Sequence, residues 1–261
     1  MAIERLRIST SGAHEVPPLL PGQMTLRRDS VHVWMIPLPS DEGDTNETSV
    51  LSSDEIIRAR RFRFAEDRAH YVCAHSSLRR ILGAYLVADP SLLTFASAAC
   101  GKPYLSGAYA GATLRFNLSH TRGLALCAIG LEREIGADVE AVTRSVDVDA
   151  VARDSFSPAE HNALLRLAPE ERRAAFFRVW TRKEAYVKAV GEGLGCDTRG
   201  FTVSLLDGDM DALVSSSLKP EDVSSWRVQS VDCPHGYSGA VAAAGRDWST
   251  KIAIWDLRQA R

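Results

Sequence analysis

Two short segments restrict the architecture of this chain more than the rest of its sequence does. The first, 136–140, follows an apolar run at 124–129, and this order predicts a strand. Successive side chains of a strand point to opposite faces, so Asp138 and Glu140 share one face while Val139 points into the core. The chain must therefore fold so that one strand face accommodates two carboxylates.

The second segment, 180–188, predicts an α-helix. It belongs to a longer helix expected over 169–190, which Gly191, Gly193 and Gly195 end, because glycine is common where helices terminate. Residues four apart share a helix face, so one stripe is expected, and it consists of Trp180, Glu184 and Lys188.

Packing of this stripe against the carboxylate face of the strand would gather charged groups at one point. Asp138, Glu140 and Glu184 would supply three carboxylates, and Lys188 one ammonium. Three carboxylates repel one another unless a cation lies between them. Hard oxygen ligands with open positions suit Mg²⁺ completed by water and substrate phosphate. The alternative is an ordinary i,i+4 pair of Glu184 and Lys188 beside a solvated strand face.

Composition excludes several classes of protein. With 261 residues, of which 45% are hydrophobic and 25% charged, the chain suits one large domain or two modest ones. A net charge of -2 argues against a nucleic-acid partner, and no run reaches the roughly 20 apolar residues of a membrane helix. The start of the chain lacks the apolar stretch of a signal peptide. Five scattered cysteines without a CxxC pair argue for free thiols and a cytoplasmic location.

The expected elements divide the chain into two halves that follow a loose tail at 1–30. The half at 31–134 has strands expected over 31–38, 114–119 and 124–129 and helices over 54–64 and 66–87. The half at 135–258 has helices expected over 148–153, 158–167 and 169–190 and strands over 135–142, 201–206, 226–231, 239–244 and 252–255, the last four antiparallel. Each half is thus a strand, then helices, then a hairpin.

Three finer expectations follow from local patterns. Ser53 is the expected cap of the helix over 54–64. Alternation over 114–119 predicts that Leu114, Phe116 and Leu118 face inward while Arg115, Asn117 and Ser119 face outward. The stretch 207–225 is expected to be a surface insertion between strands.

Basic residues form two further groups of candidates. The first group is Arg58, Arg60, Arg61, Arg63 and Arg68, with Arg79 and Arg80 downstream. Most of these are expected on a solvated face, but one or two suit a compact dianion such as a ribose phosphate, whose geometry matches a guanidinium. Lys102, on a turn, and His120, at a strand end, are candidates for a diphosphate, with ordinary surface roles as the alternative. The sequence has no GxGxxG, Walker A or HExxH motif.

Four motifs together resemble the 4′-phosphopantetheinyl transferases in their order and approximate spacing. They are Gly101-Lys102-Pro103, Asn117-x-Ser119-His120, Gly136-x-Asp138-x-Glu140 and Trp180-x-x-Lys183-Glu184-Ala185-x-x-Lys188. The length and the two-half layout resemble the Sfp type, a pseudo-dimer in one polypeptide. The resemblance covers roughly 58–201. Glu55 stands where members often carry a basic residue, and Ala137 where a bulkier apolar residue is common.

The resemblance implies an α+β fold, with two similar α/β halves in a pseudo-twofold arrangement, each a small, mostly antiparallel sheet packed on a long helix. It implies Mg²⁺-dependent transfer of 4′-phosphopantetheine from coenzyme A to a serine of an apo acyl or peptidyl carrier protein. Adenosine 3′,5′-bisphosphate would be released. The expected protein is a cytoplasmic monomer that serves fatty acid, polyketide or nonribosomal peptide biosynthesis, with neither nucleic acid nor membrane as partner.

The same resemblance implies roles for individual residues. Asp138, Glu140 and Glu184 would hold Mg²⁺, and Asp138, Glu184 and Lys188 would act in catalysis, with Glu184 the first choice of base and Glu140 the second. Coenzyme A would be bound by a set of residues comprising Arg58, Arg60, Arg61, Lys102, Pro103, Ser119, His120, Lys183 and Lys188. Two alternatives are a Mg²⁺-dependent nucleotide-diphosphate hydrolase and a non-catalytic module that binds a carrier protein or coenzyme A.

Overall fold

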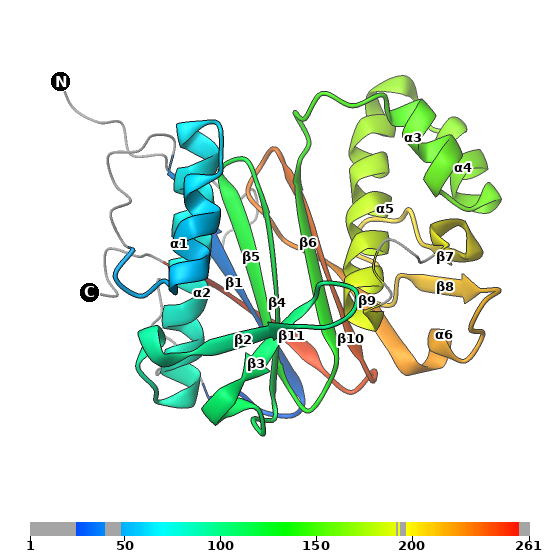
Figure 1. The fold of residues 1–261 in the computed structure, drawn as a ribbon. Helices are drawn as coiled ribbons and strands as arrows, with labels where there is room; N and C mark the ends of the chain where they lie inside the picture. The colour runs from blue at the N-terminus through cyan, green and yellow to red at the C-terminus, as the bar shows by residue number, and fades with distance from the viewer. Residues whose placement is uncertain (1–24, 40–47, 192, 194–196, 256–261) are drawn as a thin grey trace.

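The computed structural model describes residues 25–39, 48–191, 193 and 197–255. Most of the tail predicted at 1–30, together with Gly195, lies outside the described residues. The described residues form an α+β fold in which two long helices, α2 (Ala65–Leu86) and α5 (Pro169–Val190), lie on opposite sides of the strands (Figure 1). The fold class predicted from the sequence is therefore confirmed.

The first sheet has the strand order β11-β1-β5-β4. Its strands are β1 (Ser30–Pro37), β4 (Leu114–Thr121), β5 (Leu124–Leu131) and β11 (Ser249–Ile254). On β1, Trp34 and Ile36 join the core cluster beneath α2, whereas Val31 and Val33 join the cluster between the two sheets. Both faces of β1 are apolar because protein covers both of them.

The last strand departs from the prediction that 252–255 is antiparallel to its neighbour. β11 pairs parallel with β1, in a register that places Ser30 opposite Ser249 and Val33 opposite Ile252. The chain thus returns from its second half to complete the sheet of its first. Local alternation predicts a strand correctly but carries no information about the direction of its partner.

The second sheet has the order β6-β10-β9, and all its pairs are antiparallel. Its strands are β6 (Ile135–Ala141), β9 (Trp226–Val231) and β10 (Tyr237–Ala244). Helix α5 packs on this sheet through a cluster that includes Phe176, Phe177 and Val179. Its bounds agree with the prediction, since Pro169 opens it and Gly191, at φ 77°, ends it in the left-handed conformation.

Shorter elements surround this framework. They are α1 (Ser53–Arg60), α3 (Val148–Ser155), α4 (Pro158–Leu165), α6 (Asp222–Ser225), the hairpins β2 (Thr94–Ser97) with β3 (Pro103–Ser106) and β7 (Phe201–Val203) with β8 (Leu213–Ser216), and the 3₁₀ turns η3 (Pro90–Leu92), η4 (Gly107–Tyr109) and η6 (Thr198–Gly200). The helix cap predicted at Ser53 is in fact Ser52, which forms a capping box with Glu55. The predicted insertion at 207–225 contains β8 and α6 rather than loop alone.

Two global features accompany the fold. Among the helices in the described part of the chain, none combines the length and the apolar character that crossing a membrane requires. The four described cysteines, Cys73, Cys100, Cys127 and Cys233, are free thiols, and Cys196 lies outside the described residues.

Candidate active site

The two sheets meet where the edge strands β4 and β6 lie side by side. Side chains of β4 complete the hydrogen bonding of β6: Asn117 Oδ1 accepts the Ala137 N–H at 2.9 Å, and Thr121 Oγ1 accepts the Ala141 N–H at 3.2 Å. Asn117 and Ser119 are consequently buried, which corrects the prediction that they face outward. They are polar because the adjoining strand edge needs partners, and not because water reaches them.

Helix α5 approaches β6 so closely that only glycine fits at the point of contact. A Cβ atom on Gly136 would lie 2.1 Å from the Ala185 carbonyl oxygen and 2.4 Å from the Ala189 nitrogen. Gly136, Asp138 and Glu140 share one strand face. The close approach therefore brings that face against the stripe of α5 that begins at Trp180.

At this contact, three elements of the fold meet at Asp138. Its Oδ1 accepts hydrogen bonds from Lys188 Nζ of α5 at 2.6 Å and from Ser119 Oγ of β4 at 3.0 Å. Lys188 Nζ also donates to Ser119 Oγ at 3.0 Å. Asp138 is 5% exposed, and its second oxygen, Oδ2, is buried without a hydrogen-bond partner. An orphaned carboxylate oxygen in a buried position is a coordination position for a cation.

The other two candidate carboxylates lie within electrostatic reach of Asp138. Burial, followed by the negative charge of Asp138, raises the pKa of both Glu140 and Glu184. Glu140 also pairs with Arg144 at 2.7 Å. Across the described residues, no three histidine, cysteine, aspartate or glutamate side chains are already placed to hold a metal ion together. In this arrangement the ammonium of Lys188 supplies the positive charge beside Asp138.

The donor set nevertheless suits a hard divalent cation. It offers the free Oδ2 of Asp138 and two carboxylates whose raised pKa values reflect burial and mutual repulsion. A cation among them would relieve that repulsion, and carboxylate oxygens are ligands that Mg²⁺ accepts. Trp180 stacks on Phe176 in the core of the second half, so its role is packing.

His120 lies on β4 directly after Ser119, with an exposed but crowded side chain. Loss of water is the largest cause that lowers its pKa, and His75, His70, Lys188 and Arg58 lower it further, in that order. Basic groups from three helices, α1, α2 and α5, and from strand β4 therefore share one electrostatic environment. A pocket of about 460 Å³ adjoins it, lined by Phe62, Glu66, Asp67, His70, His120, Thr121 and Arg122.

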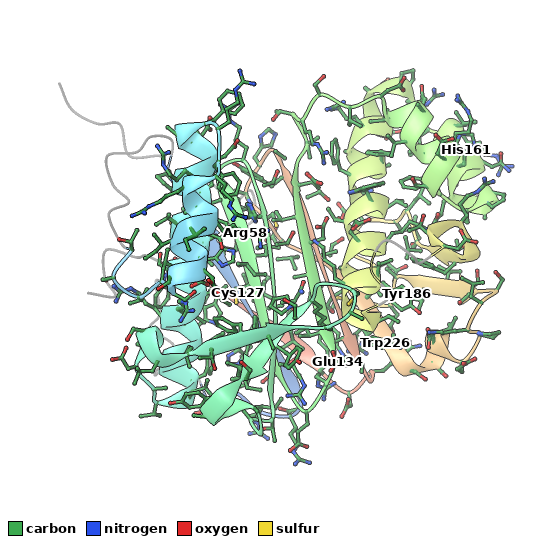
Figure 2. The ribbon with its side chains drawn as sticks, in the orientation of Figure 1. Arg58, Cys127, Glu134, His161, Tyr186 and Trp226 are labelled. Carbon is green, nitrogen blue, oxygen red and sulfur yellow. The ribbon has the colours of Figure 1, made fainter. Side chains whose placement is uncertain are left out.

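Of the candidate arginines, Arg58 has the most defined position. Its guanidinium lies 5.5 Å from the centroid of the Tyr71 ring, and Figure 2 labels it on the side of the molecule formed by α1 and α2. Arg60 and Arg61, at the end of α1, are exposed. Arg79 is buried instead and donates to Glu55 at 2.7 Å, so its role is structural.

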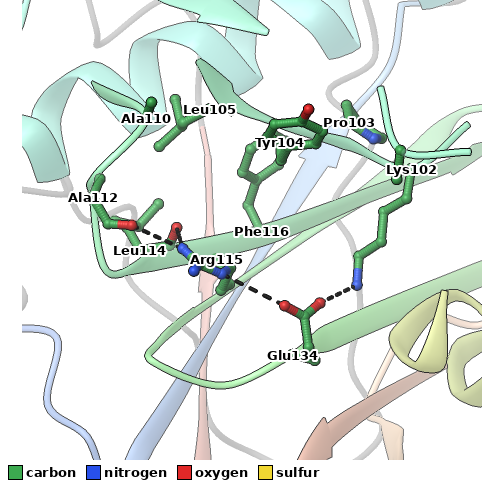
Figure 3. Close-up of a pocket in the computed structure, with 11 residues that line it drawn as sticks. Lys102, Pro103, Tyr104, Leu105, Ala110, Ala112, Leu114, Arg115, Phe116 and Glu134 are labelled. Carbon is green, nitrogen blue, oxygen red and sulfur yellow. Dashed lines mark hydrogen bonds and ion pairs between the residues drawn. The ribbon is translucent and has the colours of Figure 1, made fainter. Parts of the chain in front are cut away.

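The turn that carries Lys102 and Pro103 lines a different pocket of about 280 Å³ (Figure 3). Lys102 Nζ donates to Glu134 at 2.8 Å and to the Ala189 carbonyl at 3.1 Å. It thereby connects the β2–β3 hairpin to the start of β6 and the end of α5. Lys102 could bind a phosphate, as predicted, only if its ammonium left Glu134. Arg115 Nε lies 3.6 Å from the other carboxylate oxygen of Glu134.

The structure corrects the expected role of Lys183. Its ammonium is 2% exposed and donates to both oxygens of Glu160, at 2.8 and 2.9 Å, and to the Phe201 carbonyl at 2.7 Å. Glu160 also forms the capping box of α4 with Ser157 and accepts the Val203 N–H at 2.6 Å. Lys183 therefore joins α4, α5 and β7 inside the second half and is not available to coenzyme A. Its neighbour Glu184 points to another face of α5, as helical geometry requires.

Sequence reasoning did not single out Glu160, His70 or His75. Glu160 sits three residues after Ser157, and this capping-box spacing is visible in the sequence, but its buried partner is not. His70 bonds to the Pro39 carbonyl at 2.9 Å, and His75 lies 3.4 Å from Glu55. Isolated histidines on a helix carry no local signal, so only the fold could identify their neighbours.

The chain is similar to proteins of one enzyme family over most of its length. A model of the 4′-phosphopantetheinyl transferase superfamily matches residues 134–244, and a model of the N-terminal part of 4′-phosphopantetheinyl transferases matches residues 38–130. The 4′-phosphopantetheinyl transferase HetI of Nostoc sp. is 36% identical over 233 residues, which cover 89% of this chain and 95% of HetI.

Two further relatives are more distant and match slightly less of the chain. The 4′-phosphopantetheinyl transferase Sfp of Bacillus subtilis is 28% identical over 82% of this chain and 92% of its own length. A phosphopantetheinyl transferase of Thraustochytrium sp. is 27% identical over 86% of this chain and 83% of that relative. The two family models include both long helices and the adjoining strands β4 and β6. With the extensive match to HetI, they show that the chain belongs to the 4′-phosphopantetheinyl transferase superfamily as a single-chain enzyme of the Sfp type.

Proposed function

We propose that this enzyme transfers the 4′-phosphopantetheine group of coenzyme A to a serine hydroxyl of an apo carrier protein. The observation that carries the proposal is the meeting of Asp138, Ser119 and Lys188 at the junction of the two halves. An ammonium, beside carboxylates that can hold a divalent cation, suits a diphosphate, whose transfer depends on positioning and on compensation of its charge.

The proposal includes Mg²⁺ held by Asp138, Glu140 and Glu184. The unsatisfied Oδ2 of Asp138 and the raised pKa values of the two glutamates support this choice. When bound, such an ion would neutralise charge on the diphosphate oxygens. Lys188 would then leave Asp138, which requires only rotation of its flexible side chain, and donate to the diphosphate.

The residues of the chain divide the remaining work. The serine oxygen of the carrier attacks the phosphorus next to pantetheine, and the bond from that phosphorus to the oxygen of adenosine 3′,5′-bisphosphate breaks. Glu184 is the first candidate to accept the serine proton, directly or through a water on the cation. Glu140 is the second candidate. Lys188 and His120 bind the diphosphate, and Lys188 can protonate the leaving bisphosphate.

The adenosine end of coenzyme A is assigned to the α1–α2 side. Arg58 is the first candidate for the 3′-phosphate, with Arg60 and Arg61 next along α1. Pro103 and the pocket around it are candidates for the adenosine itself. The carrier belongs to fatty acid, polyketide or peptide synthesis, and a monomer in the cytoplasm would suffice for this reaction.

The test is incubation with coenzyme A, Mg²⁺ and a panel of apo carrier proteins, followed by the intact mass of each carrier. The expected result is a gain of one phosphopantetheine group that Asp138→Ala abolishes while the fold remains intact. Release of phosphopantetheine to water without a carrier would favour a diphosphate hydrolase instead. Binding of coenzyme A without turnover on any carrier would favour a non-catalytic module.

A control separates the metal site from the substrate site. Arg58→Ala should weaken coenzyme A more than 3′-dephospho-coenzyme A while the Mg²⁺ dependence is unchanged. Normal turnover of Asp138→Ala would end the metal-site argument, and equal loss of both substrates in Arg58→Ala would remove Arg58 from the 3′-phosphate.

A further inference from the structure

Three charged residues that line the 280 Å³ pocket form a row of alternating charge in its wall (Figure 3). Lys102 Nζ donates to Glu134 Oε2 at 2.8 Å, and Arg115 Nε lies 3.6 Å from Glu134 Oε1. Figure 3 shows the Glu134 carboxylate between the two cations, with one oxygen directed at each. Two basic side chains therefore share one carboxylate.

Glu134 has more room to move than the two cations beside it. Its side chain is 52% exposed, that of Arg115 44% and that of Lys102 only 15%. Arg115 Nη1 donates to the Ala112 carbonyl at 2.8 Å and to the Leu114 carbonyl at 3.2 Å, so the backbone fixes its guanidinium. The 3.6 Å separation between Arg115 and Glu134 is longer than a hydrogen bond, and a small rotation of the carboxylate would close it.

The ammonium of Lys102 has one partner that it can keep and one that it can exchange. Besides Glu134, it contacts the Ala189 carbonyl at 3.1 Å, at the end of α5. That carbonyl belongs to the last turn of a helix, where a donor is otherwise lacking and a positive charge is favourable. The ion pair with the half-exposed Glu134 contributes little to stability, because water screens it. The bond to Glu134 is thus the one more easily exchanged.

We propose that Glu134 competes with coenzyme A for Lys102, and that Arg115 receives the Glu134 carboxylate when Lys102 turns to a phosphate of coenzyme A. The inference rests on the proposed function, because it takes coenzyme A as the substrate and Lys102 as a ligand of its phosphates. The exchange keeps every charge compensated: the ammonium passes from a carboxylate to a phosphate, and the carboxylate from an ammonium to a guanidinium. Glu134 therefore sets the affinity for coenzyme A without contacting it.

Calorimetry with coenzyme A, Mg²⁺ and the full chain tests this exchange in the absence of any carrier. Glu134→Gln should bind coenzyme A about threefold more tightly than the native chain, because a neutral amide competes less for the ammonium. If Glu134 instead held Lys102 in a productive position, the same variant would bind coenzyme A more weakly. Weaker or unchanged binding by Glu134→Gln would overturn the proposal.

Two double variants test the route of the effect. The gain from Glu134→Gln should fall below about 1.5-fold in a chain that also carries Lys102→Ala, whereas a general effect of lost negative charge would persist there. Arg115→Gln should weaken coenzyme A about threefold in the native chain but less than about 1.5-fold beside Glu134→Gln. A gain that persists in Lys102→Ala, or equal effects of Arg115→Gln in both backgrounds, would contradict the exchange.

Glu132→Gln is the matched control. Glu132 lies in the same link between β5 and β6, and its side chain is 40% exposed and pairs with Arg28 at 2.6 Å instead of with a residue of the pocket. Loss of its charge should change the affinity for coenzyme A by less than about 1.5-fold. A gain as large as that of Glu134→Gln would show that Lys102 is not the group that responds.

The result also separates this inference from the proposed function. A native chain that neither binds coenzyme A nor modifies a carrier would overturn both. A native chain that modifies carriers, with an affinity for coenzyme A that does not rise in Glu134→Gln, would overturn only the competition for Lys102.

Discussion

The contact between Gly136 and α5 yields a quantitative prediction. A Cβ atom at this position would lie 2.1 Å from the Ala185 carbonyl oxygen, and ordinary contacts begin near 3.4 Å. The neighbouring atoms belong to the helix backbone, including Ala189 N and Cα, and cannot rotate away. In Gly136→Ala, α5 must therefore retreat from β6 by about 1.3 Å at this point.

The cost follows from the size of that displacement. Overpacking of a core costs roughly 1–3 kcal/mol, and a clash with immobile backbone belongs at about the upper end. A loss of about 3 kcal/mol lowers the melting temperature of a chain of this size by roughly 6–12 °C. The same retreat carries Glu184 and Lys188 away from Asp138, so transfer activity should fall even at temperatures where the variant is folded.

The assay is a thermal melt monitored by circular dichroism. Activity is measured separately at about 20 °C, below the melting transition. Gly111→Ala is the matched control, because a Cβ there meets nothing within 4 Å and its backbone is outside the left-handed region. The control should remain within about 0.5 kcal/mol of the native chain. If Gly136→Ala melts within about 2 °C of that control, the close approach of strand and helix is not what fixes the site.

Three other predictions address separate parts of the fold. Lys183→Met leaves Glu160 as an unpaired buried charge, so the free energy of unfolding measured in urea should fall by about 3–5 kcal/mol. The affinity for coenzyme A should stay unchanged. Weaker binding of coenzyme A without a loss of stability would show that Lys183 contacts the substrate. Glu55 has a pKa lowered from 4.5 to about 2, so its contribution of about 3 kcal/mol is present above pH 4.5 and is lost as pH falls toward 2. The native chain should accordingly lose more stability than Glu55→Gln over that range, and parallel curves would contradict this. Mg²⁺ should raise the melting temperature of the native chain but not of Asp138→Asn, and an equal rise in both would place the ion elsewhere.

For the site residues, the sequence pattern correctly predicted which side chains share a face of one strand or one helix. The face shared by Asp138 and Glu140 follows from strand alternation, and that of Glu184 and Lys188 from helical spacing. What the pattern could not supply is the meeting of the two faces, because it depends on a glycine whose role appears only when a helix lies against it. Lys183 illustrates the reverse case: it belongs to the motif, yet its ammonium is buried on Glu160.

Polar residues at the junction of the two sheets were the hardest to interpret. Asn117 and Ser119 follow the alternation of a half-exposed strand, and the same pattern arises when a second strand edge replaces water as their partner. The partners of Lys102 could not be predicted either, because a lysine on a turn gives no indication that its ammonium contacts Glu134 and the end of α5.

The sequence by itself determined the types of the long helices and of the strands of the two main sheets, the bounds of α5 and β9, and the superfamily, because proline, glycine and apolar periodicity act over a few residues. Only the tertiary structure decided the parallel pairing of β11 with β1, the burial of the β4 side chains and the partners of Lys102 and Lys183. The reason is physical. A backbone conformation is chosen by neighbours in the chain, whereas the partner of a polar group is whichever donor or acceptor the packing of distant segments brings within hydrogen-bond reach.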